Sequence, residues 1–547
     1  MALAPGAWGE PRFPDWAYHA RLADLVLDPS VPDGELDELP EEWAGQGYTA
    51  VLVHFDAENG HDSLIDERGF AEYARRLGRL DDACRKRGIR TVWYVNGAEV
   101  MTPKAAQDPR RPSLARAHPD WLQVDEQGRP IVFTGLSYDW VTPDMEDAWI
   151  CPRSPYRDLL ASRIRALVER GLDAVWVDAV FLPGVRPREI WGCFCARCEK
   201  AYQDAQGKPL PRSPADPDWP RFLAFRHRSI AEHLHALSRA ARDAGIFALY
   251  ETSSIDGAEA TVLGNDPTWN ARPDLGMAPE IEEEAPADFW RSVRFCRDVS
   301  GDVPIWVLHY AKDLPNGLWK LAAVAAHAPA YYPTVESDDE PSLRKLARAG
   351  FRRLDRMAEW TKGTAPWATA GLGYSSRLRD ADPSGKTGHH GAYLRLAAKW
   401  SREHVPYRVF DLDRLDAKAD LSALRTFALP EVDRLEPAAE EALRPVPVLV
   451  VGRAPANRAG GPVASDAELQ DLPFRLEASE TSFAEWRRSP DGRTTCVILA
   501  HARLPATVKG SGLRAGKVAV DGRAFPVRDG AFSVDCRETT TVIRWED

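Results

Sequence analysis

The sequence predicts an α/β protein in which a (β/α)8 TIM barrel is followed by a small α/β domain and a C-terminal β-sandwich. Three observations support this fold class. Short apolar runs alternate with longer amphipathic stretches over the first two thirds of the chain. Eight such runs are present, the number that closes a barrel. The chain of 547 residues is too long for one core. We expect domains at residues 1–362, 363–458 and 465–547.

The eight apolar runs have the length and composition of strands in a buried parallel sheet. They are Trp16 to Arg21, Ala50 to Phe55, Thr91 to Asn96, Ala174 to Phe181, Phe247 to Glu251, Leu275 to Glu280, Ile305 to Tyr310 and Ala330 to Val335. The expected helices between them are Gly69 to Arg87, Tyr156 to Arg170, Arg221 to Ala244, Asp288 to Val299 and Leu318 to His327. Gly88, Gly171 and Gly245 stand where left-handed helix caps belong.

Polar side chains follow most of these runs. Barrel enzymes carry their catalytic groups at the C-terminal ends of the strands and on the loops that follow. The residues at these positions are His54, Asp56, Tyr94, Asn96, Asp178, Glu251, Glu280, Glu282, His309, Tyr310 and Glu336. A structural hydrogen-bonding role fits any one of them equally well. Together they predict an active site at this end of the barrel.

The remaining sequence has a different pattern. A helix at residues 392–403 and strands at 407–411, 426–429 and 446–451 predict the small α/β domain. A linker rich in Gly, Pro and Ala spans residues 452–464. Short strands at 494–500, 517–520, 531–534 and 539–545 then predict the sandwich.

Charge and composition exclude several classes of partner. The net charge of −12 argues against nucleic acid and anionic membranes, and no apolar run is long enough to span a bilayer. No secretory signal is visible at the N-terminus, so we expect a cytoplasmic protein. The 19 tryptophans suit either sugar stacking or ordinary cores.

Three cysteines lie within six residues, at Cys193, Cys195 and Cys198. This spacing favours metal ligation over a disulfide framework. Tetrahedral zinc needs a fourth ligand, and Cys151 is the candidate because its loop emerges at the same barrel face. A closed site of four cysteines would hold a structural zinc. Reduced cysteines that bind no metal are the alternative.

These segments resemble the glycoside hydrolase family 42 β-galactosidases. Cys151-Pro-Arg-Ser-Pro-Tyr-Arg and Cys193-Phe-Cys-Ala-Arg-Cys198 are similar to that family's zinc-binding segments, with one residue missing before Tyr156. Residues 404–443 look like its flavodoxin/amidotransferase-like domain, which serves in trimerisation. The resemblance implies a barrel glycosidase with structural zinc that forms a homo-oligomer, a trimer or a dimer.

One departure separates the chemistry from that family. Family 42 enzymes end the fourth strand in Asn-Glu, whereas Ala179 and Val180 stand at those positions here. The stretch from Gly171 to Phe181 instead resembles the α-L-fucosidase-like barrels and a related group of hypothetical glycosyl hydrolases, which use a strand-four Asp. Residues 118–130 and 278–282, with Trp290, also resemble that group. The resemblance implies that Asp178 is catalytic.

Glycoside hydrolysis usually needs two carboxyl groups that flank the scissile bond. Asp178, held by an apolar strand, is our candidate nucleophile, although it could instead cap the following loop. Glu280, Glu282 and Glu251 compete for the role of acid/base, with Glu280 slightly ahead and Glu251 next. Neighbouring carboxylates could raise the pKa of Glu280, whereas Glu251 directly ends a strand.

Several polar side chains are expected to bind sugar hydroxyls. They are Asp56, His61, Tyr94, Asn96, His309 and Tyr310, with Trp140 as a stacking platform. Trp93, Trp176 and Trp306 are expected in the core. The sequence therefore predicts a glycoside hydrolase, retaining, that acts on an oligosaccharide or small glycoside. The alternatives are a catalytically inactive carbohydrate-binding barrel and a transglycosylase or lyase. No organic cofactor is expected.

Overall fold

The chain forms two compact units in the computed structural model. The structure describes residues 13–56, 60–134, 141–183, 190–252, 257–328, 330–335, 340–382, 384–457 and 475–546. The N-terminal unit comprises Asp15–Glu280 and Asp302–Ile305. The C-terminal unit comprises Ile281–Gly301 and Trp306–Asp547, together with Met1–Pro14.

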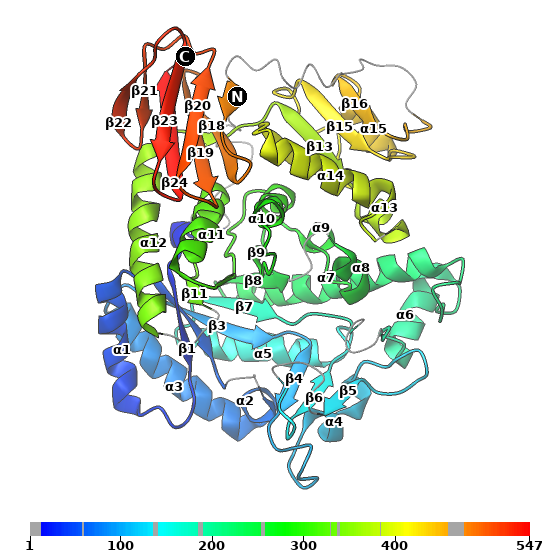
Figure 1. The fold of residues 1–547 in the computed structure, drawn as a ribbon. Helices are drawn as coiled ribbons and strands as arrows, with labels where there is room; N and C mark the ends of the chain where they lie inside the picture. Colours follow the sequence, from blue (N-terminus) through cyan, green and yellow to red (C-terminus); the bar gives the residue numbers. More distant parts are fainter. Residues whose placement is uncertain are drawn as a thin grey trace. The chain divides into compact units, whose positions relative to one another are not determined.

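A parallel sheet of six strands forms the core of the N-terminal unit (Figure 1). Its strands, in spatial order, are β1 (Leu22–Val26), β2 (Ala50–His54), β3 (Arg90–Asn96), β7 (Ala174–Asp178), β8 (Phe247–Thr252) and β9 (Gly276–Pro279). Beyond β9, a parallel bridge joins Met277 to Ile305. Since all neighbours are parallel, the C-terminal ends of these strands meet along one edge.

Helices connect these strands. They are η1 (Asp15–His19), α1 (Asp33–Gln46), α2 (His61–Leu64), α3 (Glu67–Arg85), α4 (Leu114–Ala117), η2 (Pro119–Trp121), α5 (Tyr156–Val168), α6 (Ala196–Gln206), α7 (Trp219–Asp243), α8 (Ala258–Leu263) and α9 (Pro267–Asn270). The Asp66 carboxylate caps α3 by accepting a bond from the Gly69 N–H. The three predicted glycine caps, Gly88, Gly171 and Gly245, have φ of 73°, 115° and 89° and are confirmed.

The two faces of the sheet differ in chemistry. Trp93 of β3 packs on Phe55, which stacks on Tyr73 of α3, so this face of the strand meets the helices. Side chains alternate between faces along a strand. Tyr94 therefore lies on the opposite face, away from α3.

A small antiparallel sheet follows β3, and the sequence pattern gave no indication of it. Its strands are β4 (Glu99–Thr102), β6 (Glu146–Trp149) and β5 (Val132–Thr134), in that spatial order. Gln123, within this insertion, donates from its side-chain amide to the main-chain carbonyls of Ile150 and Phe181.

Three of the eight predicted strands need correction. The first run forms η1 with a tilted ring contact between Trp16 and Phe247, and the strand begins only at Leu22. The seventh run contributes the bridge at Ile305 and the short β10 (Tyr310–Ala311). In the eighth only β11 (Thr334–Val335) is a strand, because the preceding Pro333 has no N–H to donate to a ladder.

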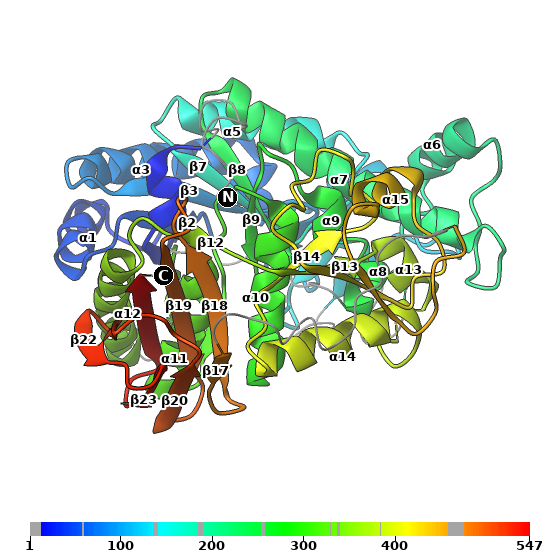
Figure 2. The same ribbon diagram turned by 90° about the horizontal axis from the view of Figure 1, so that it is seen from above.

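The C-terminal unit begins with helices and a parallel sheet (Figure 2). Its helices are α10 (Pro286–Ser300), α11 (Leu314–His327), α12 (Glu340–Trp360), α13 (Ser376–Ala381), α14 (Gly388–Arg402) and α15 (Pro437–Leu443). The sheet has the order β14 (Tyr407–Asp411), β13 (Ala370–Tyr374), β15 (Thr426–Pro430) and β16 (Val448–Val451). The three strands predicted for this region are present, and β13 is an additional central strand.

Two antiparallel sheets complete this unit. One has the order β12 (Ala365–Pro366), β18 (Ser482–Arg488), β19 (Thr494–His501), β24 (Thr540–Glu546), β21 (Lys517–Val520) and β22 (Arg523–Pro526). The other has the order β17 (Arg475–Glu477), β20 (Ala506–Ser511) and β23 (Ala531–Cys536). Buried side chains from both sheets, among them Trp486, Val508, Phe532 and Trp545, form one cluster. The four strands predicted for this region are all present.

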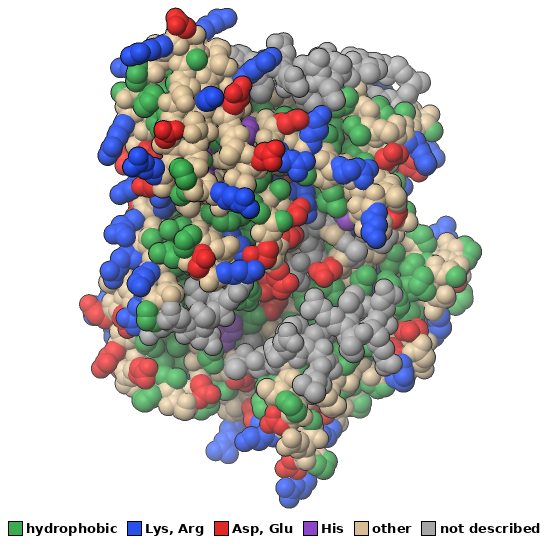
Figure 3. Space-filling view, viewed as in Figure 1, with side chains coloured by type: hydrophobic (Ala, Val, Ile, Leu, Met, Phe, Trp, Pro, Cys, Tyr) green, Lys and Arg blue, Asp and Glu red, His purple; other side chains and the backbone are tan. Residues whose placement is uncertain are grey.

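Charged side chains are mixed over the visible surface. On the face drawn in Figure 3, the blue Lys and Arg and the red Asp and Glu are interspersed. Among the described helices, none combines the length and apolar character needed to cross a membrane.

Candidate active site

Three acidic residues stand at the C-terminal ends of neighbouring strands. Asp178 is the last residue of β7, Glu251 is the penultimate residue of β8, and Glu280 directly follows β9. The Glu280 N–H donates to the Thr252 carbonyl at 3.0 Å, which extends the β8–β9 pairing to this residue. The order of the sheet therefore brings three carboxyl groups to one edge.

Asp178 is held by groups on either side of its carboxylate. The Tyr94 hydroxyl donates to Oδ2, and the Ala179 N–H donates to Oδ1 at 2.5 Å. Ala179 has φ of 47°, a left-handed conformation that is costly for a residue with a Cβ. Strain of this kind is concentrated at functional sites. Here it accompanies the turn that brings the Ala179 amide back to the Asp178 carboxylate.

Glu251 lies deeper than Asp178 and is only 3% exposed. The Trp176 indole N–H donates to Glu251 Oε2 at 2.6 Å. The Asn265 amide donates to the main-chain carbonyl of Glu251 at 3.0 Å, so the backbone is fixed as well. Asp178 is partly exposed and neighbours Glu251 across the β7–β8 pairing, one residue beyond the Val177–Tyr250 pair, and the two carboxyl groups interact through a hydrogen bond. The two carboxyl groups are thus in direct contact.

Of the two carboxyl groups, Glu251 has the more strongly raised pKa. Burial raises the pKa of Glu251 well above its ordinary value, and the charges of Asp178 and Glu280 raise it further. Burial also raises the pKa of Asp178, but the hydrogen bonds from Tyr94, Ala179 and Glu251 oppose that rise. Burial and the neighbouring carboxylates raise the Tyr94 pKa, so its hydroxyl stays a donor.

His54 belongs to the same cluster, although it is not among the predicted sugar-binding residues. Its ring stacks on Tyr94 with centroids 4.0 Å apart, and its Nε2 lies 2.9 Å from Asp24 Oδ1. His54 lowers the pKa of Asp178 electrostatically. Its position at the end of β2, in register with Tyr94, was the available signal.

Predicted site residues near β2 and β3 have different surroundings. Tyr94 contacts Asp178 as described. Asn96 is buried, and its amide donates to Glu99 Oε2 at 3.1 Å. Asp56 Oδ1 accepts from the Gly60 N–H at 2.8 Å, and His61 is buried at the start of α2. Asp56 and Asn96 therefore use part of their hydrogen-bonding capacity to hold the local backbone and a neighbouring side chain.

Other predicted residues lie elsewhere. Trp140 and Glu336 are outside the described residues. His309 and Tyr310 belong to the C-terminal unit. There the His309 ring is fully buried edge-on to Phe289, and Tyr310 is 39% exposed. Trp93, Trp176 and Trp306 are buried as expected. Trp176 nevertheless contributes its N–H to the site.

The four predicted cysteines gather in one buried cluster. Their sulfur atoms all lie within 4.8 Å of one another, with Cys151–Cys198 at 3.5 Å and Cys195–Cys151 at 3.6 Å. Metal–sulfur bonds of about 2.3 Å in a tetrahedron place sulfurs about 3.8 Å apart. The observed spacing fits one metal ion, so the predicted grouping of Cys151, Cys193, Cys195 and Cys198 is confirmed.

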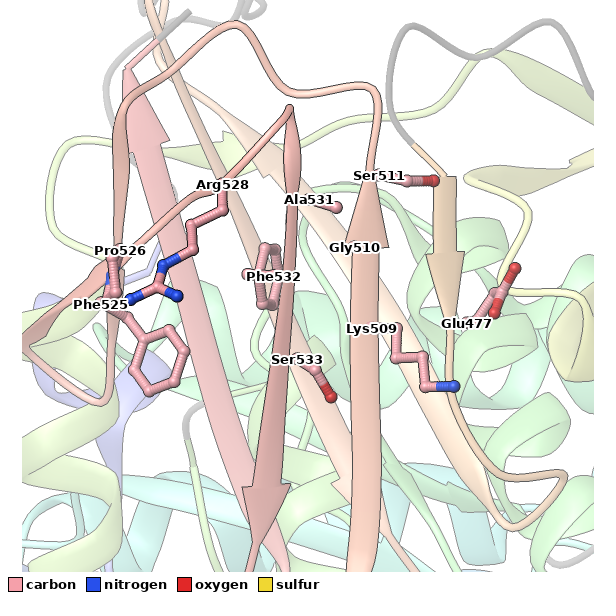
Figure 4. Close-up of a pocket in the computed structure, with 10 residues that line it drawn as sticks. All are labelled: Glu477, Lys509, Gly510, Ser511, Phe525, Pro526, Arg528, Ala531, Phe532 and Ser533. Carbon is pink, nitrogen blue, oxygen red and sulfur yellow. The ribbon is translucent and has the colours of Figure 1, made fainter.

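A cavity of about 550 Å³ lies on the C-terminal sandwich, away from these residues in the sequence (Figure 4). Lys509 and Glu477 lie on one side of β23, and Arg528 and Phe525 lie on the other. It contains one carboxylate, Glu477, and therefore lacks the pair that glycoside hydrolysis needs. The carboxyl cluster at the sheet edge is the stronger candidate.

Comparison with known proteins gives matches at the level of fold. No family model and no curated sequence matches the chain. The α-L-fucosidase isoenzyme 2 from Paenibacillus thiaminolyticus is similar with a TM-score of 0.61 and 12% identity, covering 96% of this chain and 99% of that one. The β-galactosidase from Bacillus circulans sp. alkalophilus has a TM-score of 0.64 at 11% identity, with the same coverage.

A third structure agrees with these two. The cold-adapted β-galactosidase from Rahnella sp. R3 has a TM-score of 0.62 at 11% identity, covering 97% of this chain and 98% of that one. The described chain has a parallel α/β sheet followed by antiparallel sheets. Over nearly its full length, it is similar in fold to solved glycoside hydrolases.

Proposed function

We propose that this protein is a retaining glycoside hydrolase in which Asp178 is the nucleophile and Glu280 the acid/base. The observation that carries the proposal is the Asp178 carboxylate, oriented by Tyr94 and Ala179 among other carboxyl groups at the sheet edge. The fold similarity to a fucosidase and two β-galactosidases supports this class of reaction. We propose that the parallel strands close into the expected (β/α)8 barrel.

The carboxylate of Asp178 attacks the anomeric carbon in this mechanism, and a glycosyl ester forms as the bond to the leaving group breaks. Glu280 gives its proton to the leaving oxygen. Glu280 then takes a proton from water, whose oxygen attacks the anomeric carbon, and the bond between that carbon and the Asp178 carboxylate breaks. Each carboxyl group returns to its starting protonation state. Contacts with the sugar hydroxyls and with the leaving group determine which substrate is accepted.

Geometry favours Glu280 over Glu251 as the acid/base. Retaining enzymes separate the two carboxyl groups by about 5–5.5 Å so that the anomeric centre fits between them. Glu251 is in hydrogen-bond contact with Asp178 and almost fully buried, so no sugar fits between the two. Glu280 is partly exposed and acts electrostatically on both Glu251 and Tyr94.

The remaining expectations belong to the same proposal. Asp56, His61, Tyr94 and Asn96, which belong to the N-terminal unit, contact the sugar. One structural zinc ion is held by the four thiolates, which leave no open position for catalysis. The domains end near residues 362 and 458, and the protein acts in the cytoplasm as a homo-oligomer.

The test compares wild type with Asp178→Asn on a panel of aryl glycosides, with product stereochemistry followed by NMR. We expect one sugar to be released with retained configuration, and D178N to lose at least about 1,000-fold in kcat while its thermal unfolding is unchanged. Full activity of D178N would remove Asp178 from the mechanism. Release of the inverted anomer would refute the nucleophilic role.

A second candidate is a carbohydrate-binding protein without turnover. The direct contact between Asp178 and Glu251 favours it, because this pair lacks the separation of either mechanistic class. It predicts that wild type and D178N both bind the sugar and that neither releases the aryl group. Calorimetric titration with the free sugar beside the activity screen separates the two candidates.

A further inference from the structure

Glu251 is a buried carboxyl group that the proposed reaction does not use. It comes from the same strand edge as the nucleophile and is 3% exposed. Its backbone is fixed by Asn265 and its side chain by Trp176. Burial of a carboxyl group is destabilising unless the group is neutral and hydrogen-bonded. Its presence beside Asp178 therefore calls for a specific role.

The contacts of Glu251 determine which way its hydrogen bond to Asp178 runs. The Trp176 indole is a donor only, so Glu251 Oε2 accepts from it. Asp178 accepts from Tyr94 on Oδ2 and from Ala179 on Oδ1. A further bond between two carboxyl groups needs one O–H. Because Asp178 already receives two donors, Glu251 is the group that donates.

We infer that Glu251 is a positioning residue: fixed by Trp176, it donates a hydrogen bond to Asp178 and, with Tyr94 and Ala179, aims that carboxylate at the substrate. The inference rests on the proposed function and extends it. Glu251 keeps its proton throughout the reaction and touches neither sugar nor water. Its contribution is the geometry of the nucleophile, and the stabilisation of Asp178 when that carboxylate leaves the ester.

The electrostatic surroundings of Glu251 agree with this role. The charged or titratable groups that act on it are Asp178 of β7 and Glu280 after β9. Tyr94 of β3 lies beyond Asp178, with His54 of β2 stacked on it. Both acidic neighbours raise the Glu251 pKa, so the donor form persists at neutral pH. Deprotonation at high pH would replace the bond by repulsion.

Two substitutions separate positioning from acid/base catalysis. Gln at position 251 keeps both contacts: its carbonyl accepts from Trp176 and its NH₂ donates to Asp178. We expect E251Q to keep kcat within about tenfold of wild type and E251L to lose about 100-fold or more in kcat, with KM little changed. An acid/base role predicts the opposite for E251Q, with a loss as large as that of E280Q.

The pH profile gives an independent readout. In wild type, loss of the Glu251 proton contributes to the alkaline limb of kcat/KM. Because Gln does not titrate, E251Q should lose that contribution, and its alkaline limb should then reflect the loss of the Glu280 proton alone. Glu169→Gln, an exposed Glu→Gln change at the end of α5, is the matched control and should leave the profile unchanged.

A third measurement needs no turnover. Infrared difference spectra at neutral pH should contain the protonated-carboxyl absorption of both Glu251 and Glu280 in wild type, D178N and E169Q, and E251Q should lose the part that belongs to Glu251. Thermal unfolding of each variant verifies that it is folded. Inactivity of E251Q with activity restored by azide, full activity of E251L, or a protonated-carboxyl band unchanged in E251Q would each overturn the positioning role. Failure of the proposed function appears separately, as an active D178N.

Discussion

At the scale of single residues, Tyr94 connects two parts of the site. Its ring stacks on His54, which Asp24 orients, and its hydroxyl reaches Asp178. The hydroxyl is buried among carboxyl groups that raise its pKa, so it donates over the whole working pH range. Tyr94 therefore links His54 at the end of β2 to the Asp178 carboxylate.

Replacement of Tyr94 by Phe should change both rate and pH dependence. The Tyr94 hydrogen bond lowers the Asp178 pKa, so its removal raises that pKa. Asp178 must be ionised to attack, and the acid limb of kcat/KM should therefore move to higher pH. We also expect kcat to fall by about 10- to 100-fold. The measurement is the pH–rate profile on the best aryl glycoside.

Tyr73→Phe supplies the control, because Tyr73 lies on α3 and stacks on Phe55. It should keep the wild-type acid limb. An acid limb that stays in place in Y94F, or moves to lower pH, contradicts the assigned contact.

At the scale of elements, the thiol cluster joins two loops of the N-terminal unit. Cys151 precedes α5, while Cys193 lies after β7 and Cys195 and Cys198 lie at the start of α6. The Arg153 N–H points at the Cys151 sulfur at 3.4 Å, a contact that suits a thiolate. A metal ion at this position would hold both loops in place.

Purified protein should contain one zinc ion per chain, measured by mass spectrometry. Cys198→Ser should lose the metal and lower the thermal unfolding midpoint, and a chelator should do the same to wild type, because metal binding stabilises only the folded loops. Cys84→Ala removes a buried cysteine of α3 outside the cluster and should retain zinc. Zinc-free wild type from zinc-supplemented culture would contradict the assignment.

The strand β13 depends on two glycines. A Cβ at Gly371 would lie 2.5 Å from a ring carbon of Phe427, and one at Gly373 would lie 2.9 Å from Leu412. Both neighbours are buried core residues, so neither can move without cost. The close approach of β13 to its neighbours therefore requires glycine at these positions.

Gly371→Ala should destabilise the C-terminal unit by about 1–3 kcal/mol through overpacking. Gly34→Ala in α1 is the opposite case, since a Cβ there meets nothing within 4 Å and alanine favours helix. Urea unfolding of the two variants should thus give changes of opposite sign. Equal stability of G371A and wild type would show that Phe427 can repack.

The sequence was informative about elements with strong periodicity. Runs such as Ala174 to Phe181 and Phe247 to Glu251, which contain Asp178 and Glu251, predict both the parallel strands and the carboxyl groups at their edge. The four cysteines were predicted as a group. These features depend on local composition and spacing, which a sequence contains directly.

Other features depend on contacts between distant segments. β13 was missed because glycine lowers strand propensity. The side chain that requires glycine at position 371 is Phe427, which lies far along the chain. The contact of Glu251 with Asp178 joins two neighbouring strands that are far apart in the sequence. Nothing in the local sequence distinguishes a hydrogen-bonded carboxyl pair from a separated one. The roles of Glu251 and Glu280 were therefore left open.

At the scale of the whole molecule, a buried arginine joins three parts of the C-terminal unit. Arg294 of α10 donates to the Tyr407 carbonyl at the start of β14 and to the Ala484 carbonyl of β18. It also pairs with Glu485 at 2.8 Å, and both side chains are less than 9% exposed. Helix, parallel sheet and sandwich thus share one ion pair.

Arg294→Leu should destabilise the C-terminal unit by about 3–5 kcal/mol, because it leaves the Glu485 carboxylate buried without its main partner. Differential scanning calorimetry should show a lower transition temperature for this unit. Arg444→Leu, at the residue that follows α15, removes an arginine whose side chain is 69% exposed and should change the transition little. A transition in R294L equal to wild type would contradict the role of the pair.

The path of the chain has a consequence for synthesis on the ribosome. The N-terminal unit is interrupted: the chain leaves it after Glu280 and returns only for Asp302–Ile305, where Ile305 bridges Met277 of β9. When β9 has just emerged from the ribosome, the nascent chain therefore carries an exposed strand edge. That edge gains its bridge only after α10, which belongs to the other unit, has emerged. Truncation near residue 280 would keep Asp178, Glu251 and Glu280 but leave β9 open to aggregation.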